Sequence, residues 1–157
     1  MTTISTPKDS GGELSAATLA LAFVGGVLAV PVFHQIMFLV FYRRDPGCPF
    51  SMKPTVPFGV PEVISSSFWG GVWGIVFALM LPRFFRGTSY WLASAITGAV
   101  ALTLVYMFVV VPLKTGAMPP DMVGLFIVGF LLNAAWGIGW ALFLRLFDRM
   151  RGQATEA

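Results

Sequence analysis

The stretch SAATLALAFVGGVLAVPVFHQIMFLVFY, residues 15–42, contains no Asp, Glu, Lys or Arg. An α-helix rises about 1.5 Å per residue, so about 20 apolar residues are enough to cross the hydrocarbon core of a bilayer. The stretch is too long for the apolar core of a signal peptide, which has about 7 to 15 residues, and Arg43 and Arg44 follow it directly. We therefore expect a membrane-spanning helix that is not cleaved off.

Three further stretches lack Asp, Glu, Lys and Arg, at residues 63–82, 87–113 and 122–144. The whole chain is 57% hydrophobic and only 11% charged, whereas a water-soluble domain carries about 25% charged residues. This composition excludes a water-soluble globule. The sequence predicts an all-α membrane protein with one domain, residues 15–147, whose four transmembrane helices lie at about 15–42, 62–82, 87–113 and 121–147.

The two ends of the chain are polar and, with four crossings, lie on the same side of the membrane. Residues 1–14 are predicted to be mobile, and residues 148–157 are predicted to form a polar C-terminal tail. Basic residues concentrate on the cytoplasmic side of membranes. Six basic residues share the side of the termini and four lie opposite, which predicts cytoplasmic termini although Arg43 and Arg44 oppose it (Lys8, Arg83, Arg86, Arg145, Arg149 and Arg151 against Arg43, Arg44, Lys53 and Lys114). These flanking charges account for the net charge of +3, and no nucleic-acid partner is expected.

The second half of the chain resembles the first half. When the chain is aligned with itself so that Trp73 falls on Trp136, WGIVFAL at positions 73–79 matches WGIGWAL at positions 136–142. This alignment, which we call the tryptophan register, gives twelve identities in 38 ungapped pairs, against about three or four expected by chance. The first and third helices align poorly in it. We predict an internal duplication of two tandem helical hairpins, residues 15–86 and 87–151, with a proline-rich loop joining the first two helices.

Small residues recur every fourth position in the second and fourth helices. Such stripes let helix backbones approach closely in a membrane, where the hydrophobic effect does not drive helices together. A ligand groove is the alternative, but we favour helix packing for these positions. The two stripes are Ser66, Gly70, Gly74 and Ala78, and Gly129, Asn133, Gly137 and Ala141.

Polar side chains inside a membrane span are costly and suggest function, so His34 and Gln35 are the first candidates for a site. Pro31 lies three residues before His34 and can kink the helix there. His34 fits three roles: a proton carrier, a metal or haem ligand, or a hydrogen-bonding strut between helices. We favour the strut. The chain has one His and no metal-ligand spacing, so no metal and no other cofactor is predicted.

Four further polar residues complete a predicted polar site with His34 and Gln35. Glu62 precedes the second helix, where a carboxylate favours the first turn, and Lys53 can pair with it or with a lipid phosphate. Ser66 and Asn133 lie within spans, where Asn133 is expected to bond across a helix interface. No nucleophile elbow, carboxylate pair or nucleotide loop is present, so the chain is not predicted to be an enzyme and no catalytic residue is assigned.

Three segments resemble a group of uncharacterised four-helix inner-membrane proteins of proteobacteria. The segments are Phe33-His34-Gln35, PFSMKPTVPFGVP at residues 49–61, and FWGGVWG at residues 68–74. The resemblance covers most of the chain, and its specificity comes from the loop and the start of the second helix. It implies a bacterial inner membrane, and it implies no substrate.

The leading functional hypothesis is a non-enzymatic binding or accessory subunit that contacts a membrane partner or lipid through the polar site near His34 and Glu62. Two alternatives remain open. One is a small oligomeric transporter or channel in which His34 and Glu62 couple protons or solute, and the other is a haem- or quinone-binding redox subunit. The partners expected are the lipid bilayer and either a membrane protein or a second copy of the chain.

Overall fold

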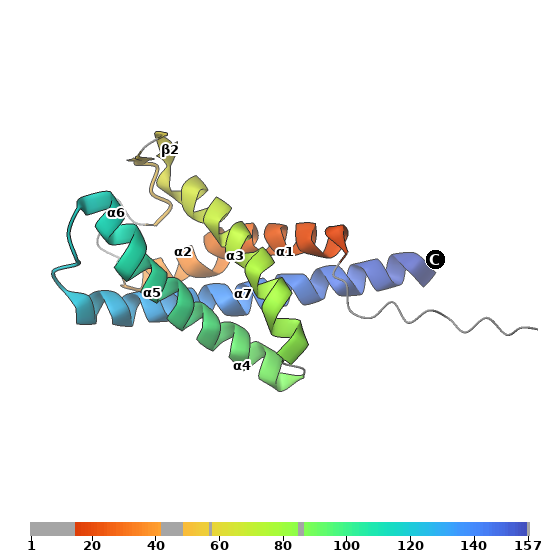
Figure 1. The fold of residues 1–157 in the computed structure, drawn as a ribbon. Coiled ribbons are helices and arrows are strands. Elements are labelled where there is room, and N and C mark those ends of the chain that lie inside the picture. The colour runs from red at the N-terminus through yellow and green to blue at the C-terminus, as the bar shows by residue number, and fades with distance from the viewer. Residues whose placement is uncertain (1–14, 42–48, 57, 85–86, 157) are drawn as a thin grey trace, which may run out of the picture.

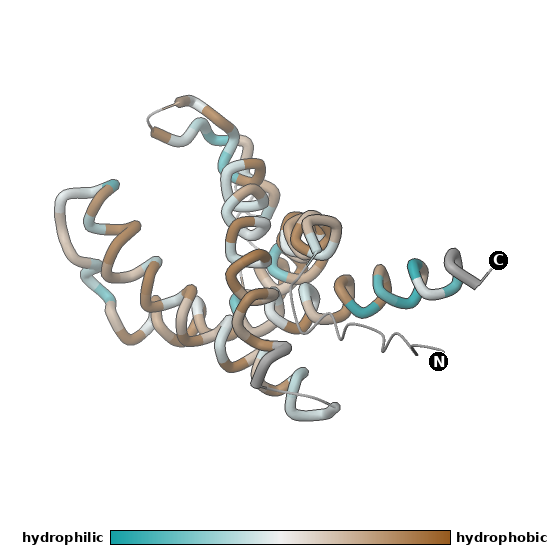
Figure 2. Tube along the Cα trace, turned by 45° about the vertical axis from the view of Figure 1, so that its right-hand side comes forward, coloured by the Kyte–Doolittle hydropathy of each residue, from teal (hydrophilic) through white to brown (hydrophobic). Residues whose placement is uncertain are grey.

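The computed structural model describes residues 15–41, 49–56, 58–84 and 87–156 (Figure 1). Four helices in it are long and apolar enough to cross a membrane, and Figure 2 shows apolar residues predominating along them. The prediction of an all-α, multi-pass membrane fold is confirmed. The predicted mobility of residues 1–14 concerns residues outside the described part of the chain.

The first span, Ala16–Phe41, consists of α1 (Ala16–Ala29), the π-helical turn η1 (Val30–His34) and α2 (Gln35–Phe41). Pro31 lies in η1 and has no backbone N–H to donate to the preceding turn. The chain widens there, and the N–H of Gln35 bonds to the Val30 carbonyl five residues back. The proline therefore shapes the backbone next to His34 and Gln35.

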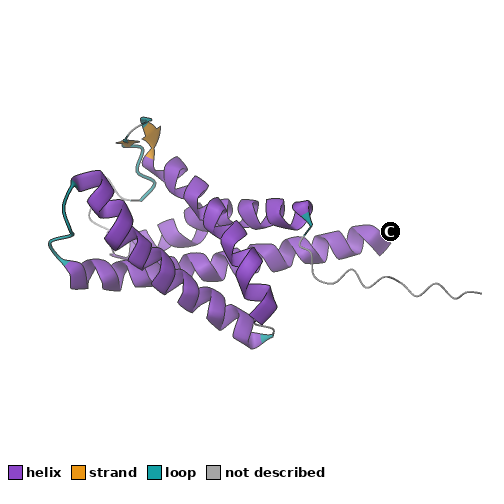
Figure 3. Ribbon diagram, viewed as in Figure 1, coloured by secondary structure: helices purple, strands orange, loops and turns teal. Residues whose placement is uncertain are grey.

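The proline-rich loop contains a β-hairpin that the sequence did not predict. Strand β1 (Pro54–Thr55) pairs antiparallel with β2 (Val60–Pro61), and the Thr55 hydroxyl donates to the Val60 carbonyl at 2.8 Å. Gly59 closes the hairpin with a φ of 68°, which favours glycine. Figure 3 shows this hairpin as the strand structure of an otherwise helical fold. We call its end of the bundle, which also holds residues 116–121, the cap side.

The second span is α3 (Glu62–Phe84), which starts directly after β2. The third span, Thr88–Thr115, consists of α4 (Thr88–Thr97), η2 (Gly98–Leu102), α5 (Thr103–Val105), η3 (Tyr106–Val110) and α6 (Val111–Thr115). Two π-helical turns, η2 and η3, interrupt it. The first span with α3 forms the first hairpin, and the third span with α7 forms the second.

The fourth helix, α7 (Met122–Glu156), is longer than the predicted range of 121–147. Its start is capped because the Gly124 N–H donates to a carboxylate oxygen of Asp121 at 2.8 Å. The residues predicted as a separate polar tail continue the same helix through Glu156. They contain no proline and several good helix formers, so a polar sequence in water can extend an apolar helix.

Glycines bring α1 and α3 into backbone contact in the first hairpin. A Cβ atom added to Gly70 would lie 2.7 Å from the Gly26 carbonyl oxygen, and one added to Gly26 would collide with the Gly70 carbonyl. A Cβ on Gly74 would collide with the Ala22 carbonyl. Such separations are too short for any side chain, so the crossing depends on glycine at these positions.

The second hairpin repeats this crossing between the third span and α7. A Cβ added to Gly98 would lie 2.7 Å from the Asn133 carbonyl oxygen, and one added to Gly137 would collide with the Ser94 carbonyl. The tryptophan register maps Gly70 to Asn133 and Gly74 to Gly137. The residues that they contact in the first and third spans match in a second alignment, which we call the glycine register. In it Gly26 falls on Gly98 and Ala22 falls on Ser94.

The use of two registers explains why the first and third helices align poorly in the tryptophan register. Gly26 and Gly70 lie further apart along the chain than Gly98 and Asn133 do. The connection inside the first hairpin is therefore the longer one, and the proline-rich loop provides the extra length. The matching contacts support the internal duplication, which remains a prediction.

Two tryptophans of α7 join the hairpins. Trp136 and Trp140 are buried, and their indole N–H groups donate to the carbonyls of Gly26 at 3.0 Å and Ala22 at 3.2 Å. A buried indole needs such a partner. Phe77 of α3 packs edge-on against both rings, with centroid distances of 5.3 Å to Trp136 and 5.5 Å to Trp140. Together with Ala29, Ala78 and Ala141 these rings form the centre of the buried core.

Replacing Gly70 with Val is predicted to destabilise the protein by about 1 to 3 kcal/mol, the usual cost of overfilling a packed contact. The added carbons collide with the Gly26 carbonyl and with Val30. Unfolding by a denaturing detergent, followed by circular dichroism, measures the loss. Gly152→Val is the matched control because a Cβ at Gly152 meets nothing within 4 Å; equal losses in both variants would contradict the crossing.

Candidate functional site

Gln35 connects the first span to the loop. Its side chain is 7% exposed, and its Oε1 atom accepts a hydrogen bond of 3.0 Å from the backbone N–H of Phe50. Phe50 has a φ of 60°, a strained conformation for a residue with a side chain. The buried amide of Gln35 thus holds the loop over the cap side of α2.

His34, the neighbour of Gln35, has a buried polar atom without a partner. Its Nδ1 atom is buried and makes no hydrogen bond to any residue in the described part of the chain. Its ring packs against Phe38 one turn further on, with centroids 5.2 Å apart. An unsatisfied buried polar atom costs about 1 to 3 kcal/mol, so a ligand or partner group that bonds to Nδ1 would recover that energy.

Neighbouring helices fix η1, the turn that ends with His34. The Val30 side chain reaches the backbone of α3, where a Cβ on Gly70 would lie 2.7 Å from Val30 Cγ2. The Phe33 ring covers Gly139 of α7 and meets Phe143 edge-on at 6.0 Å. The backbone that carries His34 and Gln35 is therefore held between α3 and α7.

Lys53 and Glu62 are neighbours at the base of the β-hairpin. The Glu62 backbone N–H donates to the Lys53 carbonyl at 2.9 Å, and both residues are exposed. The Val63 N–H donates to the Ser51 carbonyl at 3.1 Å, which extends the contact between loop and helix. Gln35 holds this loop through Phe50, and backbone hydrogen bonds join the same loop to the start of α3. Lys53 and Glu62 are thus connected to Gln35 through the loop.

Asn133 lies in the other hairpin. Its Nδ2 group donates to the Thr103 hydroxyl at 3.0 Å, across the interface of α7 and α5. Ser66 is half-buried in the first two turns of α3. The structure therefore places Asn133 in a helix-to-helix contact of the second hairpin, whereas His34, Gln35, Lys53, Glu62 and Ser66 belong to the first.

The second hairpin contains no equivalent of the His34 and Gln35 pair. The glycine register places Tyr106 and Met107 at these positions. Met107 is 3% exposed and Gln35 is 7% exposed, so an apolar side chain can fill the equivalent buried position of the second hairpin. The amide of Gln35 is therefore specific to the hairpin with the longer loop.

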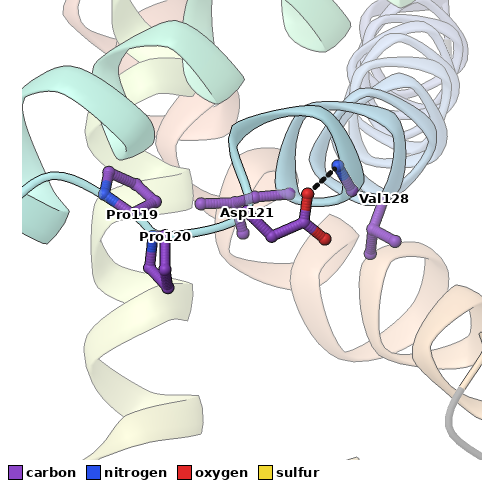
Figure 4. Close-up of a pocket in the computed structure, with 6 residues that line it drawn as sticks. Pro119, Pro120, Asp121 and Val128 are labelled. Atoms are coloured by element: carbon purple, nitrogen blue, oxygen red, sulfur yellow. Dashed lines mark hydrogen bonds between the residues drawn. The ribbon is translucent and has the colours of Figure 1, made fainter.

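A pocket of about 360 Å³ lies beside the start of α7 (Figure 4). Its charged lining group, Asp121, already accepts the hydrogen bond of Gly124 that caps the helix. The other lining residues offer no side-chain donor or acceptor (Pro119, Pro120, Gly124, Leu125 and Val128). This pocket is therefore a weaker candidate than the environment of His34.

Sequence reasoning missed two features of this part of the fold. Phe50 acts through its backbone N–H, which every non-proline residue has, so no residue type signals that contact. The hydrogen bonds from the two tryptophans to α1 were also missed, although an indole group in mid-span indicates that its N–H needs a partner.

Comparisons of the chain with protein-family models, with curated proteins and with solved structures found no match.

Replacing Gln35 with Leu is predicted to loosen the loop without unfolding the bundle. Removing the acceptor of the Phe50 N–H costs about 1 kcal/mol, so amide exchange at residues 49–56 should accelerate about fivefold. Hydrogen–deuterium exchange with mass spectrometry measures this. Asn133→Leu is the matched control, since it should affect the second hairpin and leave residues 49–56 unchanged. Unchanged exchange in Gln35→Leu would contradict the contact.

Proposed function

We propose that this chain is a non-enzymatic binding or accessory subunit of a bacterial inner membrane, with its termini in the cytoplasm. It binds a membrane-embedded partner through the cap-side polar site of the first hairpin. The observation that carries the proposal is the buried Nδ1 atom of His34, which has no hydrogen-bond partner among the described residues, beside a Gln35 amide that is already bonded.

The local backbone supports a role for His34 beyond packing. A π-helical turn inside a span places residues at positions that a regular helix would not, and such turns often occur at functional sites. In η1 this turn separates Val30, which packs on α3, from His34 and Gln35 at the turn's end. The described part of the fold thus positions His34 beside Gln35 and gives its Nδ1 atom no hydrogen-bond partner.

Gln35 and the loop give the site its structure. Because Gln35 fixes Phe50, and the same loop continues into Lys53 and Glu62, a partner on the cap side meets a preformed surface. Preformed contacts lower the entropy that binding must overcome. The side chains of Lys53 and Glu62 are exposed there, where they can contact polar groups of a partner at the membrane surface.

Inner-membrane location and orientation are parts of the proposal. The resemblance to four-helix inner-membrane proteins suggests the membrane, and the distribution of basic residues suggests cytoplasmic termini. In that orientation the cap side faces away from the cytoplasm.

The proposal predicts that His34 controls the association of a membrane component. The tagged full-length protein, purified in mild detergent from its own host's membranes, is compared with His34→Phe and His34→Asn. Asn places a polar atom close to that of Nδ1, so a stoichiometric component should be retained by His34→Asn and lost by about tenfold or more in His34→Phe. Mass spectrometry of the purified samples measures both.

Asn133→Ala is the control, because its hydrogen bond belongs to the second hairpin and should not affect that component. Identical composition in all variants would contradict the proposal. Proton flux into liposomes that is lost in His34→Phe would instead favour a transporter.

A further inference from the structure

The turn of the β-hairpin presents apolar side chains that the described part of the chain leaves uncovered. Phe58 is 87% exposed and Val56 is 84% exposed, the two highest values among the large apolar residues that the structure describes. Both residues belong to the turn between β1 and β2. Neighbouring apolar side chains that are this exposed mark a site of contact with a protein or a membrane.

The hairpin is attached to the membrane-spanning helices without a linker. Strand β2 ends at Pro61, and α3 begins at Glu62, which is also the first residue of the second span. Phe58 precedes Glu62 by four residues, which an extended chain can stretch to about 13 Å at most. Figures 1 and 2 show residues 116–121 as the extreme end of the cap side, with the hairpin standing to one side of them. The hairpin therefore lies at the level where the spans end, which is where the headgroup region of a bilayer begins.

The backbone of the hairpin suits a position among lipids, where polar groups without hydrogen bonds are costly. The Gly59 N–H donates to the Thr55 carbonyl at 2.7 Å, and the Thr55 hydroxyl donates to the Val60 carbonyl. Pro54 and Pro61 face each other across the two strands and have no N–H group to satisfy. The residues between these prolines carry no charge. The turn can therefore leave water at little cost.

The lipid-facing surface of α3 begins directly after the hairpin. Ile64 in the first turn of α3 is exposed, as is Trp69 further along the helix. Strands β1 and β2 pack on each other and on the start of α3, so the hairpin continues this surface. The charged residues Lys53 and Glu62 lie at the junction, at the base of the hairpin and not in its turn. A membrane surface can thus cover the turn and α3 together, whereas a water-soluble partner would have to displace lipid headgroups.

We propose that the β-hairpin is a membrane-interface anchor, in which Val56 and Phe58 insert among the headgroups and upper acyl chains of the cap-side leaflet. The lipid surface itself is the partner, and no particular headgroup is required because the turn carries no charge. This anchor goes beyond the partner-binding role of His34 and does not depend on it. The loop is then held by lipid at its turn and by Gln35 at Phe50.

The test measures the depth of the turn in vesicles of phosphatidylcholine and phosphatidylglycerol. The full-length protein carries Cys48→Ser and Val56→Cys with a nitroxide spin label, which leaves Phe58 in place. Electron paramagnetic resonance compares collisions of the label with oxygen, which is enriched in lipid, and with a water-soluble nickel chelate. A label on Gly152→Cys, in the polar end of α7, is the aqueous reference. The ratio of oxygen to nickel collisions should be several-fold higher for the label at position 56 than for the label at position 152.

Variants of Phe58 provide the second measurement. Phe58→Ser should lower the inserted fraction of the label about tenfold, because burial of a phenylalanine side chain contributes at least that factor, and Phe58→Leu should retain it. Leu113→Ser is the matched control, since Leu113 is 81% exposed on α6 and its loss should leave the label at position 56 unchanged. Nickel access equal to that at position 152, spectral broadening by the label of a second copy, or unchanged insertion in Phe58→Ser would each overturn the proposal.

Discussion

The close approach of helix backbones at glycine is the constraint on which the rest of the structure depends. In a bilayer, lipid tails solvate apolar helices well, so helices associate only where their shapes fit closely. Gly26 and Gly70 meet in the first hairpin, as Gly98 and the backbone of Asn133 do in the second. Each crossing brings its two helices so close that no side chain fits between them.

From these crossings the positions of the polar groups follow. Once α1 lies against α3, the carbonyls of Ala22 and Gly26 lie at Gly74 and Gly70 of α3. Because these glycines have no side chains, the indole N–H groups of Trp140 and Trp136 can reach the same carbonyls. The first span is thereby held between two helices, and its cap-side turn η1 is fixed with it. His34 and Gln35 owe their placement to the contacts that Val30 makes with α3 and that Phe33 makes with α7.

Much of the fold follows from the sequence because each span is a long stretch without charge. The ends of spans follow less well: α7 continues to Glu156 because charged residues in water can still be helical. The sequence also identifies Gly70 and Gly74 as packing residues, but it does not predict which backbone carbonyls they contact. Those carbonyls belong to a second helix, and a repeat of small residues within one helix gives no information on where the second helix lies.

The candidate site likewise has residues that the sequence predicts and others that only the structure shows. His34 and Gln35 stand out because polar side chains in a span are costly. The Phe50 amide does not stand out, since any residue of an irregular loop has one. Asn133 was grouped with His34 by residue type, and the structure places it in the other hairpin.

Crosslinking within single chains tests most directly whether two similar crossings define this fold. In a Cys48→Ser background, cysteines replace Phe23 and Phe68, whose rings are 6.0 Å apart, or Thr103 and Asn133, which share a hydrogen bond. A short bismaleimide should link each pair within one chain, in membranes and before purification. Failure of either pair to link, or linkage only between chains, would contradict the account.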